Sequence, residues 1–446
     1  MTSEELQKII FDAGIVGAGG AGFPTHKKIA PGIEQIVINA AECEPLMMVD
    51  HHIFRKHFRA IVETMNLMLD AIGAKEAIMG IKGKNMSLLD PEIVKELEGT
   101  RIKIHEIPDV YPAGDEVVLV YETTGKIIPE GAIPIMVGVM VINTETLYNI
   151  KKAIFDKEPV CDKYVTIAGD TKEDITVKVP VGMKIKELFR EVGYPNLSGK
   201  AVINGGPMMG KLVDIENDVV TKTTKGLLVF PEEHSVIQRK RASLSMSLKR
   251  ASAACCDCTM CTDMCPRHLL GYSLQVHKVI YTASHGTVND SESFLQSTLC
   301  CGCGVCTVMA CQQMLDPQSI AMAAKGALAK KGYRRKGGFA PKAPRPERRS
   351  RLVPSEKLID RLGIRQYVKD EVQRRYMDFY PDTVYIPMSQ HVGKPADPLV
   401  KKGDIVKRGD VIARTSADAL GTTMHASVNG TIREVNEKFI VIDREK

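Results

Sequence analysis

Cysteine spacing gives the clearest chemical signal in this sequence of 446 residues. Ten of the twelve cysteines lie between Cys255 and Cys311, and only Cys43 and Cys161 lie outside. Such crowding is typical of metal ligation in a cytosolic chain, where disulfides are rare. The first set follows the pattern C-x2-C-x2-C-x3-C-P and ends at Pro266: Cys255, Cys258, Cys261 and Cys265. Three closely spaced thiolates at this spacing bind three corners of a four-iron cubane, and a fourth comes from further along the chain.

A second cysteine set repeats this triple with one extra residue before its last member and Gln312 in place of the proline. Its members are Cys300, Cys303, Cys306 and Cys311. Zinc is the alternative, because paired C-x2-C motifs also hold a tetrahedral ion. Two triples, each with a fourth cysteine, favour two [4Fe–4S] clusters over zinc. If the fourth ligands cross between the clusters, Cys311 completes the first set and Cys265 the second. We expect the remaining Cys256 and Cys301 to pack beside the clusters.

A glycine-rich loop near the N-terminus is the second candidate site. Gly17, Gly19 and Gly22 satisfy G-x-G-x-x-G, with Gly20 between them. The usual Rossmann context is missing, because a strand should precede this loop and residues 3–15 are instead typical of a helix. Without Cβ atoms, the loop can still bring backbone N–H groups close to a phosphate or a flat ring. The alternative is a flexible tight turn.

Composition limits what kind of protein this is. The chain is 44% hydrophobic, enough for about three domains of roughly 150 residues. No apolar run approaches the ~20 residues of a membrane span, and the first residues lack the features of a secretory signal, so we expect a cytoplasmic protein. The net charge of +6 comes from residues 325–351, where eleven Lys/Arg accompany one Glu. This Gly/Pro-rich stretch is expected to be a solvated linker, with docking to an acidic partner as the alternative; it is no argument for nucleic acid.

The elements expected around these motifs change along the chain. Buried strands are predicted at 34–42, 75–83 and 101–107 and a helix at 57–73, which indicates an α/β domain. A hairpin turning near residues 170–172, a helix and a further strand indicate a small β-grasp-like unit. Residues 240–330 are expected to be helical and 355–375 to contain a helix, whereas 383–446 is typical of short strands in a small barrel or sandwich. An apolar stripe is predicted between the cysteine sets: Leu269, Leu270, Leu274, Val276, Val279 and Ile280.

Four motifs, in order, are similar to those of the flavin- and NADH-binding subunit of respiratory complex I. They are GAGGAGFPTHKK (17–28), INAAECEP (38–45), YPAGDE (111–116) and INTET (142–146). They resemble most closely two relatives, the RnfC component of the Rnf complex and the PduS-type cobalamin reductases of propanediol-utilisation microcompartments. The resemblance implies FMN and NADH binding at Gly17, Gly19, Gly20, Gly22, Phe23, Lys28, Asn39, Glu42, Glu44, Asp115, Glu116, Asn143 and Thr146.

The resemblance also implies the domain order of a multidomain α/β and α+β protein. The expected parts are an FMN/NADH domain at 1–155, an SLBB β-grasp domain at 160–240, a two-cluster ferredoxin-like domain at 241–325, a basic linker at 326–354 and a barrel–sandwich hybrid domain at 383–446. The hybrid domain is last, as in the cobalamin reductases, whereas RnfC carries it first. The hybrid tip at 415–426 contains no lysine, which disfavours a covalently loaded carrier.

These parts imply an NADH-dependent oxidoreductase in which a flavin converts two-electron hydride chemistry to single electrons. No catalytic side chain is required, because the cofactors supply the reactivity. We expect His26 to lie at the surface, with contact to a phosphate as the alternative. We expect His51 and His52 to lie at the surface or at a helix start, and Met208 and Met209 to serve packing. The family order implies a corrinoid, or a corrinoid-handling protein, as electron acceptor. Shell or cargo proteins of a microcompartment and a second copy of the chain are further candidate partners. An Rnf-like adaptor that reduces no corrinoid is the alternative.

Overall fold

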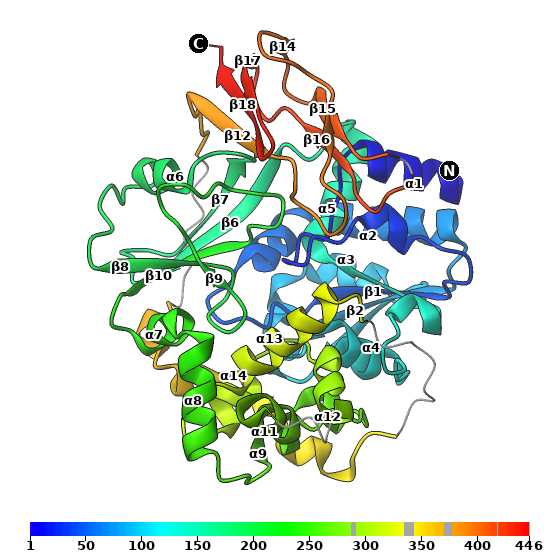
Figure 1. Cartoon of the computed structure of the whole chain (residues 1–446). Coiled ribbons are helices and arrows are strands. Elements are labelled where there is room, and N and C mark those ends of the chain that lie inside the picture. The colour runs from blue at the N-terminus through cyan, green and yellow to red at the C-terminus, as the bar shows by residue number, and fades with distance from the viewer. Residues whose placement is uncertain (287–290, 334–342, 370–376, 417, 446) are drawn as a thin grey trace.

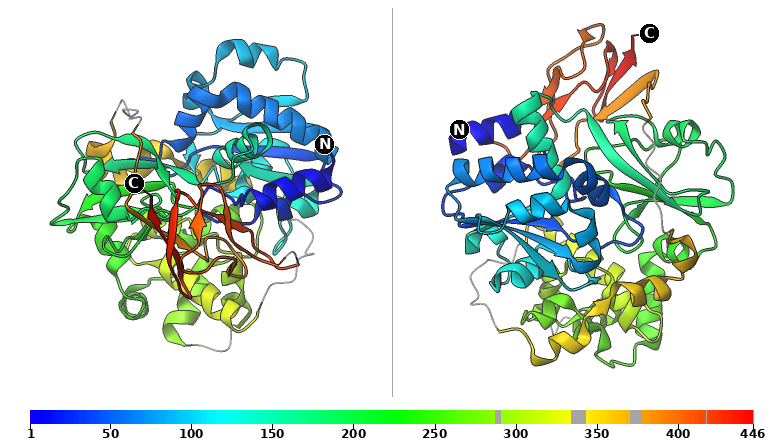
Figure 2. Two further views of the ribbon diagram at one scale, coloured as in Figure 1. Left: turned by 90° about the horizontal axis from the view of Figure 1, so that it is seen from above. Right: turned by 180° about the vertical axis from the view of Figure 1, so that it is seen from behind.

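The computed structural model describes residues 1–286, 291–333, 343–369, 377–416 and 418–445. Its centre is a parallel sheet with helices on both faces (Figure 1). Beside it lies a mixed sheet, the C-terminal strands lie at one end of the molecule, and the cysteine-bearing helices lie at the other (Figure 2). No helix within the described part of the chain is long and apolar enough to cross a membrane.

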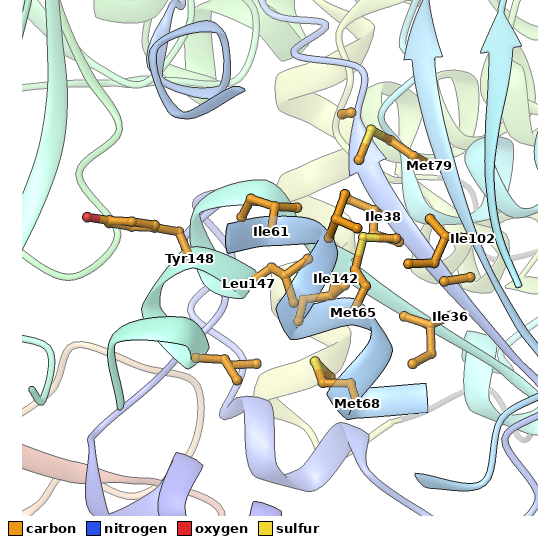
Figure 3. Packing of buried hydrophobic residues seen from close by; sticks show 14 of the residues in the cluster. Ile36, Ile38, Ile61, Met65, Met68, Met79, Ile102, Ile142, Leu147 and Tyr148 are labelled. Atoms are coloured by element: carbon orange, nitrogen blue, oxygen red, sulfur yellow. The ribbon is translucent and has the colours of Figure 1, made fainter. Parts of the chain in front are cut away.

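The parallel sheet has the order β3-β2-β1-β5, so the chain adds strands to one side of β1 and then returns to its other side. Successive side chains of a strand point to opposite faces of the sheet. In the central strand β1, both faces are buried. Ile36 and Ile38 pack against α2 (Figure 3), whereas Val37 belongs to the core on the side of α4. The elements of this part are α1 (Ser3–Asp12), β1 (Gln35–Ala40), α2 (Val49–Ile72), β2 (Glu76–Lys82), α3 (Pro91–Glu96), β3 (Ile102–Ile107), β4 (Val110–Tyr111), α4 (Glu116–Thr124), β5 (Val139–Asn143) and α5 (Thr144–Lys151).

A mixed sheet with the order β7-β6-β10-β8-β9 follows. Its first two strands form the expected hairpin, β10 joins β6 in parallel, and β8 pairs antiparallel with β10. Helix α6 packs on one face through Ile185, Leu188 and Phe189. The elements are β6 (Asp162–Gly169), β7 (Ile175–Pro180), α6 (Ile185–Glu191), β8 (Lys200–Asn204), β9 (Lys211–Leu212) and β10 (Gly226–Pro231).

The cysteines lie among short helices, as expected. All six residues of the predicted apolar stripe are buried, although the stripe spans α10, α11 and the loop between them and is not one helix face. The helices are α7 (Ser235–Arg241), α8 (Leu244–Ala254), α9 (Met260–Asp263), α10 (Pro266–Leu269), α11 (Val276–His285), α12 (Ser291–Leu295), α13 (Pro317–Lys330) and α14 (Ser355–Leu362).

The C-terminal part forms two small sheets, with the orders β12-β18-β17-β14 and β13-β15-β16. Turns at Gly403 and Gly409 adopt positive φ, which explains the repeated Gly-Asp turns. The strands are β12 (Thr383–Pro387), β13 (Asp397–Pro398), β14 (Ile405–Val406), β15 (Val411–Arg414), β16 (Thr423–His425), β17 (Gly430–Val435) and β18 (Phe439–Arg444).

Two helix predictions were inaccurate in their bounds. Helix α2 is kinked at His57, whose φ and ψ are not helical, so the helix predicted at 57–73 matches its second segment. The first segment, from Val49, was missed; there the Glu42 carboxylate accepts hydrogen bonds from the N–H groups of Asp50 and His51 and caps the first turn. The helix expected at 355–375 ends at Leu362, where Gly363 adopts a left-handed cap. Part of that expected helix, residues 370–376, lies outside the described residues.

The expectation of a solvated linker was wrong for its described C-terminal part. Helix α13 extends to Lys330, and residues 334–342 lie outside the described residues. Further on, β11 (Val353–Pro354) pairs antiparallel with β4, and Arg348 is only 7% exposed. The Arg348 guanidinium forms an ion pair with Glu122 on α4 and lies over the ring of Tyr121. The described C-terminal part of the linker, residues 343–354, therefore packs against the parallel-sheet domain. We call this segment the strap.

Replacing Arg348 should release this strap. The variant Arg348→Met leaves the Glu122 carboxylate largely buried without its partner, which costs about 3 kcal/mol. We expect faster tryptic cleavage at Arg349 and Arg351, measured by mass spectrometry of intact fragments. Arg349→Met removes the same charge from an exposed neighbour and serves as the control. Equal cleavage at Arg351 in the two variants would contradict the role of the ion pair.

Candidate functional site

The candidate nucleotide site lies where the parallel sheet changes direction. Strands β1 and β5 are neighbours, and Asn39, next to last in β1, pairs in register with Asn143, the last residue of β5. Both residues lie at the carboxyl ends of parallel strands, the edge at which open α/β sheets bind ligands. Asn143 caps α5 by accepting from the N–H of Glu145, and the Asn39 side chain donates to the carbonyl of Gly114.

The glycine loop lies beside these strand ends. The N–H of Ala18 donates to Thr146 Oγ1 at 2.9 Å, and a Cβ at Gly19 would lie 3.7 Å from the side chain of Asn143. Gly20 has a φ of +110° and nothing within 4 Å of its would-be Cβ. Gly19 and Gly20 are exposed. The loop therefore leaves open, Cβ-free backbone above the strand ends, which fits a flat ring or a phosphate.

Lys28 and Phe23 flank the loop. The Lys28 ammonium donates to Glu116 Oε1 and to the carbonyl of Val141, each at 2.9 Å, and lies 6.0 Å from the centre of the Phe23 ring. The prediction that His26 lies at the surface was wrong. It is 8% exposed and packs edge-on against Phe11, and burial lowers its pKa to about 4, so the imidazole is neutral.

Glu42 belongs to a buried charge cluster. The ammonium of Lys225, in the mixed-sheet domain, lies 3.3 Å from Glu42 Oε1 and 2.8 Å from Asp50 Oδ2. Burial raises the pKa of Asp50 to about 7. For Glu42, burial alone would raise the pKa, but the attraction of Lys225 and His51 and the hydrogen bonds from the N–H groups of Asp50 and His51 together outweigh it and hold the pKa below its usual value. His51 lies 3.7 Å from Glu42, and His52 is 5% exposed; both are in the first turn of α2, so the helix-start expectation was right and the surface expectation wrong for His52.

Glu44 connects the parallel-sheet domain to the cysteine helices. Its carboxylate accepts from the backbone N–H groups of Met208 and Met209, at 3.0 and 3.1 Å. The Tyr111 hydroxyl lies 3.1 Å from Glu44 Oε1 and 2.8 Å from the carbonyl of Cys303. Burial raises the pKa of Glu44. The Tyr111 hydroxyl has one hydrogen, which it can donate to either of these two acceptors.

The loop that receives Glu44 contains the motif GGPMMG. A Cβ at Gly206 would overlap the Glu44 carboxylate, which explains that glycine. The packing expectation was right for Met208, which is 4% exposed, and wrong for Met209, which is 52% exposed.

Asp115 makes the second connection to the cysteine helices. It caps α4 by accepting from Val117 and Val118, and its other oxygen accepts from Arg267 at 2.8 Å. Arg267 follows Cys265 by two residues. The four acidic residues of the candidate nucleotide site are thus all engaged within the protein: Glu42 with Lys225, Glu44 with Met208, Asp115 with Arg267 and Glu116 with Lys28.

The second cysteine set shares a cavity with a member of the first. Cys265 lines this cavity with Cys300, Cys303 and Cys306, and Cys301 lies beside them. Cys265, Cys303 and Cys306 are 7–8% exposed. The packing expectation for Cys301 was therefore right.

The first set gathers around Cys261 at a more open place. Burial raises the pKa of the Cys261 thiol to about 12. Three nearby thiols add to this shift, those of Cys255, Cys311 and Cys258. Cys258 is exposed, and so is Cys256, which contradicts the expectation that Cys256 is packed. In the described residues no three His, Cys, Asp or Glu side chains are grouped tightly enough to hold a single metal ion.

Sequence reasoning missed four residues of these contacts: Tyr111, Lys163, Lys225 and Arg267. Lys163 is fully buried and pairs with Glu145 at the start of α5. Their partners are distant in sequence, so no local pattern marks them. An indirect signal exists for Lys225, because it immediately precedes an apolar strand.

Three known domain families match parts of the chain. Residues 10–152 match the Nuo51 FMN-binding domain, residues 254–316 a 4Fe-4S dicluster domain, and residues 371–445 the RnfC barrel sandwich hybrid domain. Together they define a flavin and iron–sulfur oxidoreductase whose cofactors are FMN and [4Fe–4S] clusters, with NADH as the substrate of the flavin-domain family.

Curated relatives cover the whole chain. Cobalamin reductase PduS of Citrobacter freundii is 34% identical over 99% of this chain and 97% of its own length. The protein of the same name from Salmonella typhimurium strain LT2 is 35% identical, over 100% and 97%. A component of the Na+-translocating ferredoxin:NAD+ oxidoreductase complex of Acetobacterium woodii is 29% identical, over 60% and 59%. The chain belongs to the PduS cobalamin reductase family.

Substituting Gly19 should remove flavin while sparing the fold. A Cβ there makes only ordinary contacts within the protein, so Gly19→Val is expected to fold and to lose most bound FMN, because the side chain occupies the open loop edge. FMN per chain is measured by absorbance after denaturation, together with iron per chain. Gly326→Val, at an exposed position of α13, is the matched control. A Gly19→Val protein with full FMN content would show that the loop is not the flavin cradle.

Proposed function

We propose that this protein is an NADH-dependent reductase that delivers electrons to a corrinoid, reducing cob(III)alamin or cob(II)alamin towards cob(I)alamin. The observation that carries the proposal is the Tyr111 hydroxyl, which contacts Glu44 beside the candidate nucleotide site and Cys303 in the second cysteine set. When bound, FMN takes hydride from NADH and passes single electrons to iron–sulfur clusters. The protein supplies the placement of these groups.

The FMN assignment is based on the residues at the carboxyl ends of β1 and β5. Asn39, Asn143 and Thr146 line the strand ends beneath the glycine loop, and Lys28 and Phe23 flank it. These residues, with Gly17, Gly19, Gly20 and Gly22, are assigned to FMN. Glu42 and Glu44 are assigned to the nicotinamide side of this site, and Asp115 with Glu116 is assigned as its second acidic pair. Their existing partners keep each carboxylate in place, since Lys225, Met208, Arg267 and Lys28 hold them.

The cluster ligands are assigned with crossed fourth cysteines. Cys265 lines one cavity with Cys300, Cys303 and Cys306, which supports these four as ligands of one cluster, called here cluster II. Cys311 is close to Cys261 and its neighbours, which supports Cys255, Cys258, Cys261 and Cys311 as ligands of cluster I. Two-cluster ferredoxins use the same crossing.

The finer domain assignments rest on the resemblance together with the sheet topology. We assign 1–155 to the FMN/NADH domain, 160–240 to an SLBB domain, 241–325 to the dicluster domain and 383–446 to the hybrid domain. The β6–β7 hairpin, helix α6 and parallel β10 support the β-grasp assignment. The family supports a cytoplasmic site in a bacterial microcompartment, with shell or cargo proteins as partners.

Crossing predicts which cluster each fourth cysteine serves. Cys265→Ala should damage the same cluster as Cys303→Ala, and Cys311→Ala the same cluster as Cys258→Ala. Iron content and the electron paramagnetic resonance spectra of the reduced variants distinguish the two patterns. Cys256→Ala, next to a ligand but unassigned, should keep about eight irons, the content of two four-iron clusters. A Cys265→Ala spectrum that matches Cys258→Ala would reject crossing.

The proposed function itself is tested anaerobically with NADH and cobalamin. We expect reduction that saturates with cobalamin and falls at least tenfold in Cys258→Ala and Cys303→Ala, relative to Cys256→Ala. An Rnf-like adaptor, the alternative supported by the similarity to the Acetobacterium woodii protein, would reduce ferricyanide and leave cobalamin unreduced. That result would overturn the corrinoid assignment.

A further inference from the structure

The hybrid domain, which comes last in the chain, contacts both ends of the glycine loop. Helix α1 leads into the loop, and its last residue, Asp12, forms an ion pair with Arg414 of β15 at 3.1 Å. At the other end of the loop, the carbonyl of Gly22 accepts from the N–H of Val392 at 3.0 Å. Strands β15 and β16 lie beside α1 (Figure 1). These contacts join positions up to 402 residues apart along the chain.

Lys222, in the mixed-sheet domain, links the same segments from the interior. It is 2% exposed, and its Nζ donates to the carbonyls of Gly14 and Thr423 at 2.7 and 2.8 Å. Its backbone N–H donates to Gln390 Oε1 at 3.0 Å, and the Gln390 amide donates in turn to the carbonyl of Pro387 at 3.1 Å. Buried polar groups that lose their partners are costly, so these hydrogen bonds fix the three segments relative to one another.

The packing at both ends of the loop is close enough to require glycine. Gly14 has a φ of +68°, and a Cβ there would lie 2.4 Å from the carbonyl oxygen of Thr423. Gly22 has a φ of +65°, and its Cβ would lie 3.0 Å from Thr223 Cγ2 and 3.3 Å from the carbonyl oxygen of Gln390. A side chain at either position would push the neighbouring domains away. Both glycines therefore serve the contact between domains.

The middle of the loop has fewer contacts. The N–H of Ala18 donates to Thr146, and its carbonyl accepts from Lys163 Nζ at 3.3 Å. Beyond this point Gly20 is exposed, with nothing within 4 Å of its would-be Cβ. A short loop whose ends are fixed keeps its backbone N–H groups in place before a ligand arrives, which lowers the entropic cost of binding.

We propose that the hybrid domain is a clamp on the glycine loop and that Lys222 and Gln390 are positioning residues for FMN. The clamp consists of Lys222 and the segment 390–392. This inference rests on the assignment of the glycine loop to FMN in the proposed function, and it adds the domain that keeps the loop in its binding shape. Without the clamp the ends of the loop are no longer fixed, so FMN dissociates faster. The flavin site is therefore complete only when the last domain of the chain has folded.

The test measures FMN release from the anaerobically prepared holoenzyme. The rate constant is obtained after dilution, from the rise in fluorescence of free flavin. Lys222→Met removes both Nζ hydrogen bonds, and Gln390→Met removes the acceptor of the Lys222 N–H. Each should increase the rate constant by about tenfold or more, since buried partners are lost. Because both residues act on one clamp, the double variant should exceed the faster single variant by no more than about twofold.

Lys184→Met is the matched control. It is the same substitution at another lysine between the same two domains, where Nζ lies 4.9 Å from the centre of the Tyr385 ring on β12. FMN release from this variant should stay within about twofold of the wild-type rate, because Lys184 is not part of the clamp. All variants should keep about eight irons per chain, which shows that the dicluster domain is intact.

Hydrogen exchange tests the clamp without any substitution. Coupling between two binding events is reciprocal, so a clamp that retains FMN must itself be stabilised by FMN. Removal of FMN from the wild-type protein should speed amide exchange in peptides that cover 388–394 and 421–425. Peptides that cover β14, at the outer end of the hybrid domain (Figure 1), should not change. In Lys222→Met, exchange at 388–394 should be fast with or without FMN.

Three results would overturn the clamp. They are unchanged FMN release in both Lys222→Met and Gln390→Met, an equal acceleration in Lys184→Met, and exchange at 388–394 that does not respond to FMN. Full FMN content in Gly19→Val would instead reject the loop assignment, and the inference with it. Loss of FMN from Gly19→Val together with normal retention in the clamp variants would reject the clamp alone. NADH-driven reduction of cobalamin by the wild-type protein reports the electron acceptor separately.

Discussion

The hydroxyl of Tyr111 is the contact on which the arrangement of the cofactor sites depends. It is 2% exposed and lies between a carboxylate of the parallel-sheet domain and a main-chain carbonyl of the second cysteine set. A buried polar group that loses its partner costs about 1–3 kcal/mol, so this hydroxyl fixes the spacing between the two sites. The same carboxylate, that of Glu44, also holds the loop at Met208 and Met209. The Glu44 carboxylate and the Tyr111 hydroxyl together thus join the parallel-sheet domain, the mixed-sheet domain and the cysteine helices.

Buried ion pairs repeat this design at the other boundaries between the parts of the chain. Lys225 joins the mixed sheet to Glu42 and Asp50, and Arg267 joins the cysteine helices to Asp115. Such pairs contribute little net stability, because desolvation offsets their attraction, but they penalise any arrangement that separates the partners. They suit a protein that must hold cofactors at constant separation. The packed strap that contains Arg348 adds a further link, from the cysteine helices to the outer face of α4.

The contrast between the two cysteine sets gives the molecule a direction. The buried set faces the nucleotide domain through Tyr111, and the open set faces the surface beside Arg250 and Met314. Exposure and nearby hydrogen bonds both influence the potential of an iron–sulfur cluster. The two cysteine sites therefore differ in their access to solvent.

The sequence by itself determined the local elements and the chemical class. Cysteine spacing within ten residues indicated cluster ligands, and apolar periodicity located β1 and the core residues between the cysteine sets, because both signals operate over short distances along the chain. The four motifs of the glycine loop and its neighbours predicted the family. Their meeting at the ends of β1 and β5 followed from the strand order that the structure shows.

Only the tertiary structure decided which distant groups meet. Tyr111 and Cys303 are 192 residues apart, and Lys225 lies 175 residues from Asp50. Cys265 is closer in sequence to Cys261 than to Cys300, yet it lines the cavity of the second set. The burial of His26 and His52 and the strap at Arg348 were also beyond local patterns. The physical reason is that burial and pairing depend on how separate sheets and helices pack together, whereas spacing and periodicity record only what one segment does within itself.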